Sequence, residues 1–544
     1  MTDADALLRG IIAHPADDTA RLVYADWLQE NGRGEEGEFI RTQCRLAAAA
    51  PDDPEYPALL ERDEELRLWL HTHAPKPHPK FPAGLEVDGP KWWWLADRGF
   101  PRFLEYDGDT RQGAPAMRRL ASALERAFKV IPTRWLVVRF ITTAQLAALL
   151  KQPVLSGLSR LTVQLAVSLD EANDAARALA ACPHLRNLRA LLLYFPFSDP
   201  GCAALAGGPW GELEWFGSPC HEVSPAGLRA LVGAAWFRNL RELKFSDGLP
   251  SGTFEELTGL PAFPRLHTLD LSHNLFSENS WQTFGRTRAF PALTCLELSS
   301  GDLSGSRLPA LAGARGFSLR VLNANRCGTG PGTGPALAAA PWASALRVLD
   351  LRANGLDLAN TKAVTASKTF TNLQHLDLSN NAIGAAGLSA LAGNRALRGL
   401  RVLKLGAAPS TRGLTPTHFG QFLTKLDLPD LRHLDLSGHP VGANAAKKLA
   451  DPKFTPLRRL MLNGCRLSDT AVAKLLAAPA LQNLVQLGLD TNNLTTGPQA
   501  LADPSTLPHL AACSLANNPI PAPVVRKLRP RAAVTDLPKT PRRT

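Results

Sequence analysis

The sequence predicts an α/β solenoid, in which short parallel strands form a sheet on the inside and helices pack on the outside, preceded by a small all-α domain. Three observations support this fold class. A nine-residue register, LxxLxLxxN, recurs through the second half of the chain. Eleven copies begin 26 or 27 residues apart, with a single interval of 31 residues. Between them lie short alanine- and leucine-rich segments whose apolar residues recur at helical spacing.

Composition places the chain among globular proteins of the cytoplasm. Its 544 residues are 45% hydrophobic and 20% charged, which is typical of a folded protein. The eight cysteines form no CxxC pair and no even framework, so we expect reduced thiols. The acidic N-terminus does not resemble a signal peptide, and no apolar window reaches the roughly 18 residues of a membrane span. We therefore expect a cytoplasmic monomer that does not enter a membrane.

Residues 1–73 are predicted to form the small helical domain, with helices over 3–13, 19–30, 35–49 and 56–71. His14-Pro15 and Asn31-Gly32 interrupt the helical pattern. Up to residue 70, 16 acidic residues stand against 7 arginines, whereas the rest of the chain is basic. We expect Leu22 and Trp27 to lie in the core of this domain, Asp18 to cap a helix and Arg21 to pair with a carboxylate. A binding site at these residues is the alternative.

Two segments connect this domain to the repeats. The proline-rich residues 74–90 predict a stiff, extended linker that would allow relative motion of the two parts. Residues 91–130 are predicted to cap the open N-terminal end of the solenoid, with the three adjacent tryptophans 92–94 covering its core. A stacking platform for a carbohydrate or a nucleic acid is the alternative use of these tryptophans.

Residues 131–520 are predicted to hold about fifteen repeats, of which the eleven from residue 240 onward are clear. The leucines of each copy point into a core that one strand cannot close alone, so neighbouring copies stack into a parallel sheet. The side chain at the ninth position can form hydrogen bonds with the backbone where the chain leaves the strand. We expect a structural ladder there, made by Asn274, Cys327, Asn354, Asn381, Cys465, Asn492 and Asn518. Four copies have another residue at this position and should leave gaps or water in the ladder. These residues are Gly248, Gly301, Ala408 and His439.

The register resembles that of the leucine-rich-repeat family, in particular the longer, ribonuclease-inhibitor-like type. The resemblance implies a curved horseshoe with the sheet on the concave side. The run from Pro15 to Gly32 is similar to a bacterial repeat-companion domain that precedes such arrays, and this second resemblance implies no particular activity.

Motifs that would indicate catalysis are interrupted. His221-Glu222 opens an HExxH pattern, but Pro225 occupies the position of the second histidine. The glycine-rich residues 328–334 include a proline that cannot donate to a phosphate. We therefore expect no catalytic residue, no cofactor and no metal. An enzyme would be favoured only if polar residues converged in a pocket between the N-terminal domain and the first repeats.

The fifth position of each copy should face the concave side, where a partner would bind. Acidic residues predominate there and make an acidic stripe, flanked by basic residues at third positions: Asp270, Glu297, Asp350, Asp377 and Asp435, with His375, His433 and Arg459. We expect the stripe either to receive a basic protein segment or to be neutralised by a second-position column, Arg320, Arg347, Arg401, Arg432 and Arg458. The 31-residue interval also contains an inserted loop, with Ser410, Thr411 and Arg412, as a candidate contact.

Residues 521–544 are rich in arginine and lysine and are predicted to form a basic, solvated C-terminal tail. The sequence as a whole favours a non-enzymatic scaffold that binds a protein partner of unknown identity. Association with a nucleic acid or another acidic partner, through the arginine-rich surface and the tail, is the alternative. An unrecognised enzyme is a third and weaker one.

Overall fold

The computed structural model of the protein describes residues 3–49, 53–73, 96–109, 111, 113–260, 262–407 and 413–537. Its internal contacts divide the chain into two compact units. The first unit runs to Gly301 and includes Arg315–Ser318, and the second contains Asp302–Ala314 and everything from Leu319 onward. Each unit is described by itself below.

The first unit begins with four helices, α1 (Asp3–Ala13), α2 (Thr19–Glu30), α3 (Gly34–Ala48) and α4 (Tyr56–His73). These bounds lie within two residues of the predicted ones. Helix α2 ends where Gly32 takes a left-handed φ of 76°, a conformation that glycine adopts at little cost. Two predictions for single residues are wrong. Leu22, which was expected in the core, is 40% exposed, and Asp18, which was expected to cap a helix, makes no side-chain capping bond. Trp27 packs against the edge of the helical core.

These helices are packed against the start of the repeats. A short hairpin, β1 (Ala96–Asp97) and β2 (Phe100–Pro101), lies between them and supplies Phe100 to the core of α1, α2 and α3. The amide of Gln43 in α3 donates to the Ala96 carbonyl over 2.9 Å, and Arg134 donates to the Ile12 carbonyl over 3.3 Å. These contacts join the helical domain to the start of the repeats within the first unit. The linker at 74–90 and the three tryptophans lie outside the described residues.

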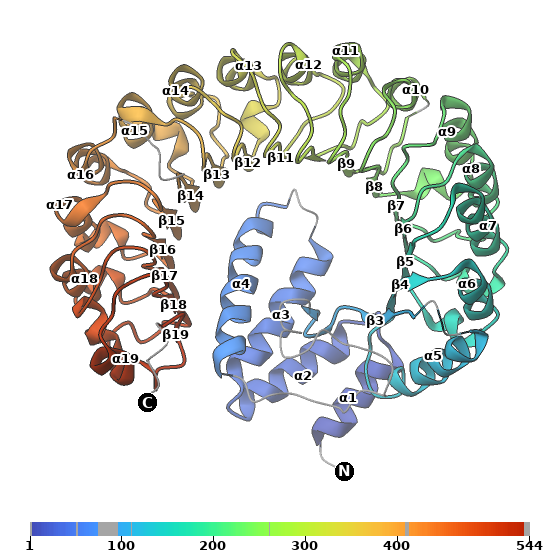
Figure 1. The fold of residues 1–544 in the computed structure, drawn as a ribbon, viewed down its shortest axis with the longest axis horizontal. Coiled ribbons are helices and arrows are strands. Elements are labelled where there is room, and N and C mark those ends of the chain that lie inside the picture. Colours follow the sequence, from blue (N-terminus) through green and yellow to red (C-terminus); the bar gives the residue numbers. More distant parts are fainter. Residues whose placement is uncertain are drawn as a thin grey trace. The chain divides into compact units, whose positions relative to one another are not determined.

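The repeats of the first unit form a parallel sheet on one side and a layer of helices on the other (Figure 1). The strands pair in chain order: β3 (Leu104–Asp107), β4 (Trp135–Ile141), β5 (Arg160–Leu165), β6 (Ala190–Tyr194), β7 (Trp215–Gly217), β8 (Glu242–Lys244), β9 (Thr268–Asp270) and β10 (Cys295–Glu297). The helices that follow them are α5 (Ala114–Ala127), α6 (Thr143–Leu150), α7 (Leu169–Ala180), α8 (Asp199–Ala206), α9 (Pro225–Val232), α10 (Ser251–Gly259) and α11 (Glu278–Arg286).

The second unit repeats the same architecture (Figure 1). Its strands are β11 (Val321–Asn323), β12 (Val348–Asp350), β13 (His375–Asp377), β14 (Val402–Lys404), β15 (His433–Asp435), β16 (Arg459–Met461), β17 (Gln486–Gly488), β18 (Ala512–Ser514) and β19 (Val534–Thr535). Its helices are α12 (Arg307–Ala312), α13 (Thr333–Ala339), α14 (Leu358–Ala366), α15 (Gly384–Ala392), α16 (Pro416–Lys425), α17 (Gly442–Ala446), α18 (Asp469–Leu476) and α19 (Ala522–Leu528).

The predicted leucine register determines how the strands stack. The fourth-position leucines Leu349, Leu376 and Leu403 are direct neighbours across strands β12 to β14, and each is 0% exposed. Side chains alternate between the two faces of a strand, so the intervening residues lie on the face away from the helices. This face, which we call the strand face, carries the candidate binding residues. The α/β solenoid fold is therefore confirmed.

The predicted solvated tail is wrong for most of its described part. Helix α19 and strand β19 continue the solenoid, and β19 pairs in parallel with β18. Val525 and Leu528 of α19 are buried. Arg531 is tied to the preceding repeat, because its guanidinium donates to the carbonyls of Leu501 and Asp503 over 3.0 and 2.9 Å. Hydrophobic contacts of Val525 and Leu528 outweigh the basic composition of this segment.

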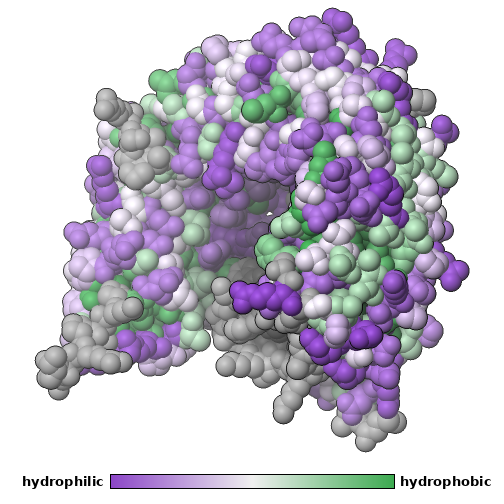
Figure 2. Space-filling model, turned by 45° about the vertical axis from the view of Figure 1, so that its right-hand side comes forward, coloured by the Kyte–Doolittle hydropathy of each residue, from purple (hydrophilic) through white to green (hydrophobic). Residues whose placement is uncertain are grey.

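Among the described residues, no helix is long and apolar enough to cross a membrane. Hydrophilic side chains predominate on the face drawn in Figure 2, with hydrophobic areas between them. Single exposed leucines, such as Leu275 at 74% and Leu358 at 59%, are ordinary on a protein surface.

Candidate functional site

The asparagine ladder is present in both units. The side-chain oxygen of Asn381 accepts from the backbone amides of Asn354 and Leu356 over 3.1 and 3.0 Å. Its amide nitrogen donates to the carbonyls of Leu351 and Leu378 over 2.8 and 3.1 Å. One buried side chain thus serves four backbone groups that the turn leaves without partners. Asn274, Asn354, Asn492 and Asn518 make equivalent bonds.

One expected gap in the ladder is filled. His439 is 0% exposed, and its Nε2 donates to the Leu405 carbonyl over 2.7 Å. Phe419 packs against the imidazole, with ring centroids 5.0 Å apart. The expectation of a gap or water at this position is therefore wrong, because an imidazole is large enough to reach the carbonyl that asparagine would bond. Ala408 lies outside the described residues.

The cysteines of the ladder have structural surroundings. Cys327 and Cys465 are buried, and Cys465 Sγ donates to the Leu436 carbonyl over 3.2 Å. Three cysteines outside the ladder are also buried, and burial raises the pKa of Cys44, Cys202 and Cys513 to about 12. A thiol must ionise to react, so such cysteines are inert in the folded chain.

All eight cysteines are buried, which predicts their behaviour toward a thiol reagent. We expect Ellman's reagent at pH 8 to titrate fewer than about one thiol rapidly in the native chain, and all eight after addition of guanidinium. A rapidly reacting thiol in the native chain would contradict the structural role of these residues.

In the first unit, the acidic stripe includes its own cation. Asp270 and Glu297 are direct neighbours on strands β9 and β10, as predicted. Lys244 of β8 lies next to Asp270 and forms an ion pair with it over 2.8 Å. Lys244 occupies the same fifth position as the acids. The charge pattern of this column was thus visible in the sequence.

In the second unit, Asp350, Asp377, Lys404 and Asp435 are successive neighbours across strands β12 to β15. Lys404 again lies within the column, and its Nζ is 3.9 Å from Asp377. Burial raises the pKa of Asp350, and the adjacent Asp377 raises it further. The structure therefore brings these three predicted acids together in one strand-face column, with one lysine among them.

The predicted basic residues form a neighbouring column on the same sheet. His375, Val402, His433 and Arg459 are successive neighbours across strands β13 to β16. The Nε2 atom of His433 is buried and has no hydrogen-bond partner. Burial lowers the pKa of His433 well below its usual value, and Lys404, Arg459 and His375 lower it further. Ser410, Thr411 and Arg412 of the inserted loop lie outside the described residues.

A groove that we did not predict crosses the strand face of the first unit. It has a volume of about 600 Å³. Its floor is apolar: Trp135, Val137 and Leu192 form one cluster, against which Phe103 and Trp215 pack. Tyr194 on the groove is 44% exposed. Asp270 and Glu297 of the acidic stripe line the same groove, together with Glu242.

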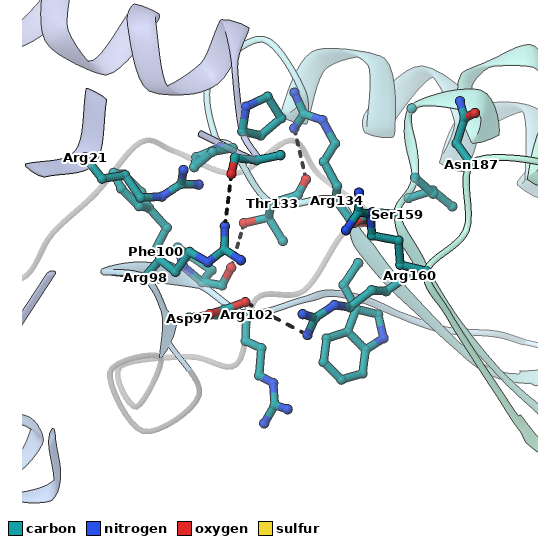
Figure 3. A pocket seen from close by; sticks show the side chains of 18 of the residues that line it. Arg21, Asp97, Arg98, Phe100, Arg102, Thr133, Arg134, Ser159, Arg160 and Asn187 are labelled. Atoms are coloured by element: carbon teal, nitrogen blue, oxygen red, sulfur yellow. Dashed lines mark hydrogen bonds and ion pairs between the residues drawn. The ribbon is translucent and has the colours of Figure 1, made fainter. Parts of the chain in front are cut away.

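A second hollow, the arginine pocket, lies between the N-terminal helices and the first repeats (Figure 3). Its volume is about 420 Å³. Six arginines and one acid, Asp97, are among the described residues that line it: Arg21, Arg98, Arg102, Arg134, Arg160 and Arg189. Polar residues do converge where an enzyme would have needed them. They are arginines, however, which stay protonated and do not serve as a nucleophile or a general base.

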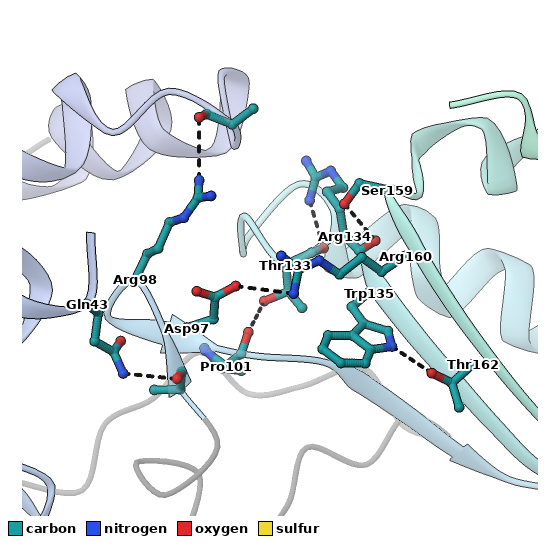
Figure 4. Close-up of polar contacts among 12 residues, drawn as sticks. Gln43, Asp97, Arg98, Pro101, Thr133, Arg134, Trp135, Ser159, Arg160 and Thr162 are labelled. Atoms are coloured by element: carbon teal, nitrogen blue, oxygen red, sulfur yellow. Dashed lines mark hydrogen bonds and ion pairs between the residues drawn. The ribbon is translucent and has the colours of Figure 1, made fainter. Parts of the chain in front are cut away.

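Polar contacts hold the pocket in place (Figure 4). Thr133 donates to the Pro101 carbonyl over 2.6 Å, and Trp135 donates to Thr162 over 2.9 Å. Asp97 lies 4.0 Å from Arg160. The sequence offered one signal for this pocket, since Arg134, Arg160 and Arg189 each stand at or just before a strand. It did not indicate that the helical domain would close the site.

Comparisons with known proteins give the class of this chain. Residues 371–392 and 427–450 match the family model described as Leucine Rich repeat. These matches identify two of the repeats as leucine-rich repeats, and the neighbouring repeats share their strand and helix. No curated protein sequence matches it.

Similar solved structures have low identity. A chain of the Rad7 and Elc1 complex from yeast is 15% identical, with 78% of this chain and 89% of that chain covered and a TM-score of 0.36. A protein from Bacteroides fragilis is 13% identical, with 49% and 74% covered and a TM-score of 0.32. A chain of the Toll and Spatzle complex from Drosophila is 14% identical, with 77% and 55% covered and a TM-score of 0.34. Sequence identities and TM-scores this low say nothing about function.

Proposed function

We propose that the chain is a non-enzymatic scaffold that binds a protein partner on the strand face of its first unit. The groove of about 600 Å³ carries this proposal. It combines an aromatic and aliphatic floor with charged residues around it. Such a pattern, a desolvated apolar centre inside a polar rim, is typical of the energetic centre of protein interfaces.

The charges around the groove indicate what the partner would present. Lys244 pairs with Asp270, and Arg139 pairs with Glu105 over 2.5 Å, so these four charges are neutralised within the chain. Burial raises the pKa of Glu242, although Arg160 and Arg102 act against this. A cation from a partner would favour the ionised form of Glu242. The groove therefore suits a segment that places an apolar side chain on the floor and a basic side chain beside Glu242.

Two substitutions test the groove directly. Tyr194→Ala removes an exposed aromatic ring, and Glu297→Lys reverses a charge on the wall. We expect each to reduce partner capture about tenfold or more, because truncating an interface aromatic or reversing a rim charge commonly costs about 1–2 kcal/mol of binding. The measurement is affinity capture from native cytosol with quantitative mass spectrometry.

Two further variants serve as controls for this test. Leu275→Ala alters an exposed apolar residue outside the groove and should leave capture unchanged. Asp350→Lys with Asp377→Lys tests the acidic column of the second unit. Loss of capture in that double variant alone would move the proposed interface to the second unit. If no strand-face variant reduces capture, a scaffold acting through these faces is excluded.

Association with nucleic acid remains the alternative, and the same protein can test it. Phosphate binding through many arginines would make retention on DNA fall steeply as salt is raised. A shallow salt dependence together with protein capture would support the scaffold.

A further inference from the structure

The arginine pocket holds more positive charge than the described residues around it neutralise. Arg21 and Arg98 share one carboxylate, that of Asp18, at 3.8 and 3.2 Å. Arg160 reaches Asp97 at 4.0 Å, and Arg189 reaches Glu214 at 3.8 Å. Within the part of the chain that the structure describes, neither Arg102 nor Arg134 forms an ion pair with an acid. Three carboxylates of the described residues therefore pair with four of the six guanidinium groups, and two are left without an acid.

Arg21 is the most informative of these residues. Only 4% of it is exposed, and its Nε is buried without a hydrogen-bond partner. The Nε of Arg98 is also buried and unpartnered. An arginine desolvated in this way is costly unless an anion completes its hydrogen bonds. Burial lowers the pKa of Arg21, and the neighbouring Arg98 lowers it further, which is what crowding of like charges produces.

Other contacts prearrange the remaining guanidinium groups. Arg134 donates to the carbonyls of Ile131 and Thr133 over 2.9 and 3.0 Å and lies over the Phe128 ring. Arg102 and Arg160 lie over the Trp135 ring, at 4.9 and 5.3 Å from its centroid. Side chains held by aromatic rings and carbonyls lose little further freedom when a ligand binds.

These side chains reach one hollow from three separate parts of the first unit. Arg21 comes from helix α2, Arg98 from the β1–β2 hairpin, and Arg160 from strand β5 (Figure 3). Docking of the helices onto the repeats is therefore what assembles the pocket. Its volume of about 420 Å³ is in the range of small-ligand sites and is too small for a folded partner.

We propose that the arginine pocket binds a small compound that carries two or more phosphate groups, with Arg21, Arg98 and Arg160 as its ligands. Guanidinium groups bond phosphate and carboxylate oxygens through paired N–H donors. The uncompensated charge favours an anion with several negative charges over a single carboxylate. This site adjoins the groove proposed above for a protein partner, because Arg102 and Trp135 line both, but its ligand is a different one.

Isothermal titration calorimetry of the full chain with pyrophosphate tests the proposal. We expect saturable binding of one pyrophosphate, with a Kd below about 1 mM in about 150 mM salt. Tripolyphosphate should bind at least as tightly. Citrate, which carries its charge on carboxylates, should bind about tenfold more weakly or worse.

Substitutions at the rim of the pocket keep the test specific. Arg98→Gln and Arg160→Gln should each weaken pyrophosphate binding about tenfold or more, since each removes a charged donor. Arg229→Gln is the matched control, because Arg229 is 54% exposed and pairs with Glu256 on the helix layer. It should bind pyrophosphate as the unaltered chain does. Thermal unfolding of all three variants, followed by circular dichroism, separates a lost site from a lost fold.

Three results would overturn the proposal. The first is absence of saturable pyrophosphate binding to the unaltered chain. The second is equal weakening in the control Arg229→Gln, which would indicate attraction to the general positive charge of the chain. The third is preference for another anion, which can show itself in two ways. Citrate could bind as tightly as pyrophosphate. Alternatively, the chain could be retained on single-stranded DNA, with this retention abolished by Arg98→Gln and Arg160→Gln but not reduced by competing pyrophosphate. Either form of this result would assign the pocket to another class of anion.

Discussion

Replacing Asn381 with leucine is expected to lower the free energy of unfolding by about 3–5 kcal/mol. The leucine side chain is of a size that fits the buried site of Asn381, but it offers neither hydrogen-bond donors nor an acceptor. The amides of Asn354 and Leu356 and the carbonyls of Leu351 and Leu378 would then lose a partner inside the solenoid. Each unsatisfied buried group costs about 1–3 kcal/mol, and partial relaxation makes the sum smaller than four separate losses. Urea unfolding followed by circular dichroism measures the difference.

Two further variants separate the ladder from a general effect of losing an amide. Asn372 is exposed and donates to the Ser344 carbonyl over 2.7 Å, so Asn372→Ala should change stability by no more than about 1 kcal/mol. Asn381→Cys should cost less than the leucine variant, because a thiol can still donate to a carbonyl, as Cys465 does toward Leu436. Equal losses for Asn381→Leu and Asn372→Ala would contradict the role of the ladder.

The sequence predicts those parts of the fold that depend on local periodicity. The leucines of the nine-residue register are buried as expected, and their strands pair in the expected order. The four N-terminal helices were predicted because helical spacing and the breaks at His14-Pro15 and Asn31-Gly32 are short-range signals. The ladder followed from the same register, since its position is a fixed number of residues from the leucines.

Features that depend on contacts between distant segments could not be predicted in this way. Arg98 meets Asp18 across 80 residues, and Arg134 meets Ile12 across 122 residues. No periodic pattern relates the helical domain to the start of the repeats, so the arginine pocket required the three-dimensional structure. The groove was missed for a related reason, because its floor comes from the early repeats, where the register is weak.

The error at the C-terminus has a different cause. The basic composition of residues 521–544 predicted a solvated tail, but Val525 and Leu528 are buried in α19. A charged segment can still supply the last helix of a solenoid when a few apolar residues face the core. Similarly, the lysines at fifth positions, Lys244 and Lys404, were visible in the column of acids that they partly neutralise.

The stability of the chain is expected to fall by about 2–3 kcal/mol when the pH is lowered from about 7.5 to about 5.5, and two histidines of the second unit are the reason. Burial lowers the pKa of His433 well below 6.5, and it also lowers the pKa of His439. The unfolded chain takes up protons on both side chains as the pH falls through about 6.5, whereas the lowered pKa values oppose this uptake in the folded chain. Protons bound only by the unfolded state favour unfolding, so stability is lost in this direction.

The environment of each imidazole explains why the folded chain resists protonation. His439 uses its Nε2 proton to bond the Leu405 carbonyl, and its Nδ1 is buried without a partner, so a second proton would have no acceptor. His433 faces positive charge from Lys404 and Arg459, and its buried Nε2 also lacks a partner. Desolvation acts on both residues, and like charge adds to it at His433.

Substitutions taken from neighbouring repeats test this assignment. His439→Asn introduces the usual ladder residue, and His433→Val introduces the residue that Val402 provides on the adjacent strand. The double variant should lose most of the pH dependence between about 7.5 and about 5.5, whereas His509→Gln at an exposed position should retain it. Urea unfolding at several pH values gives the slope for each chain. If the double variant keeps the full slope, protonation elsewhere in the chain controls its stability in acid, and the two buried imidazoles do not.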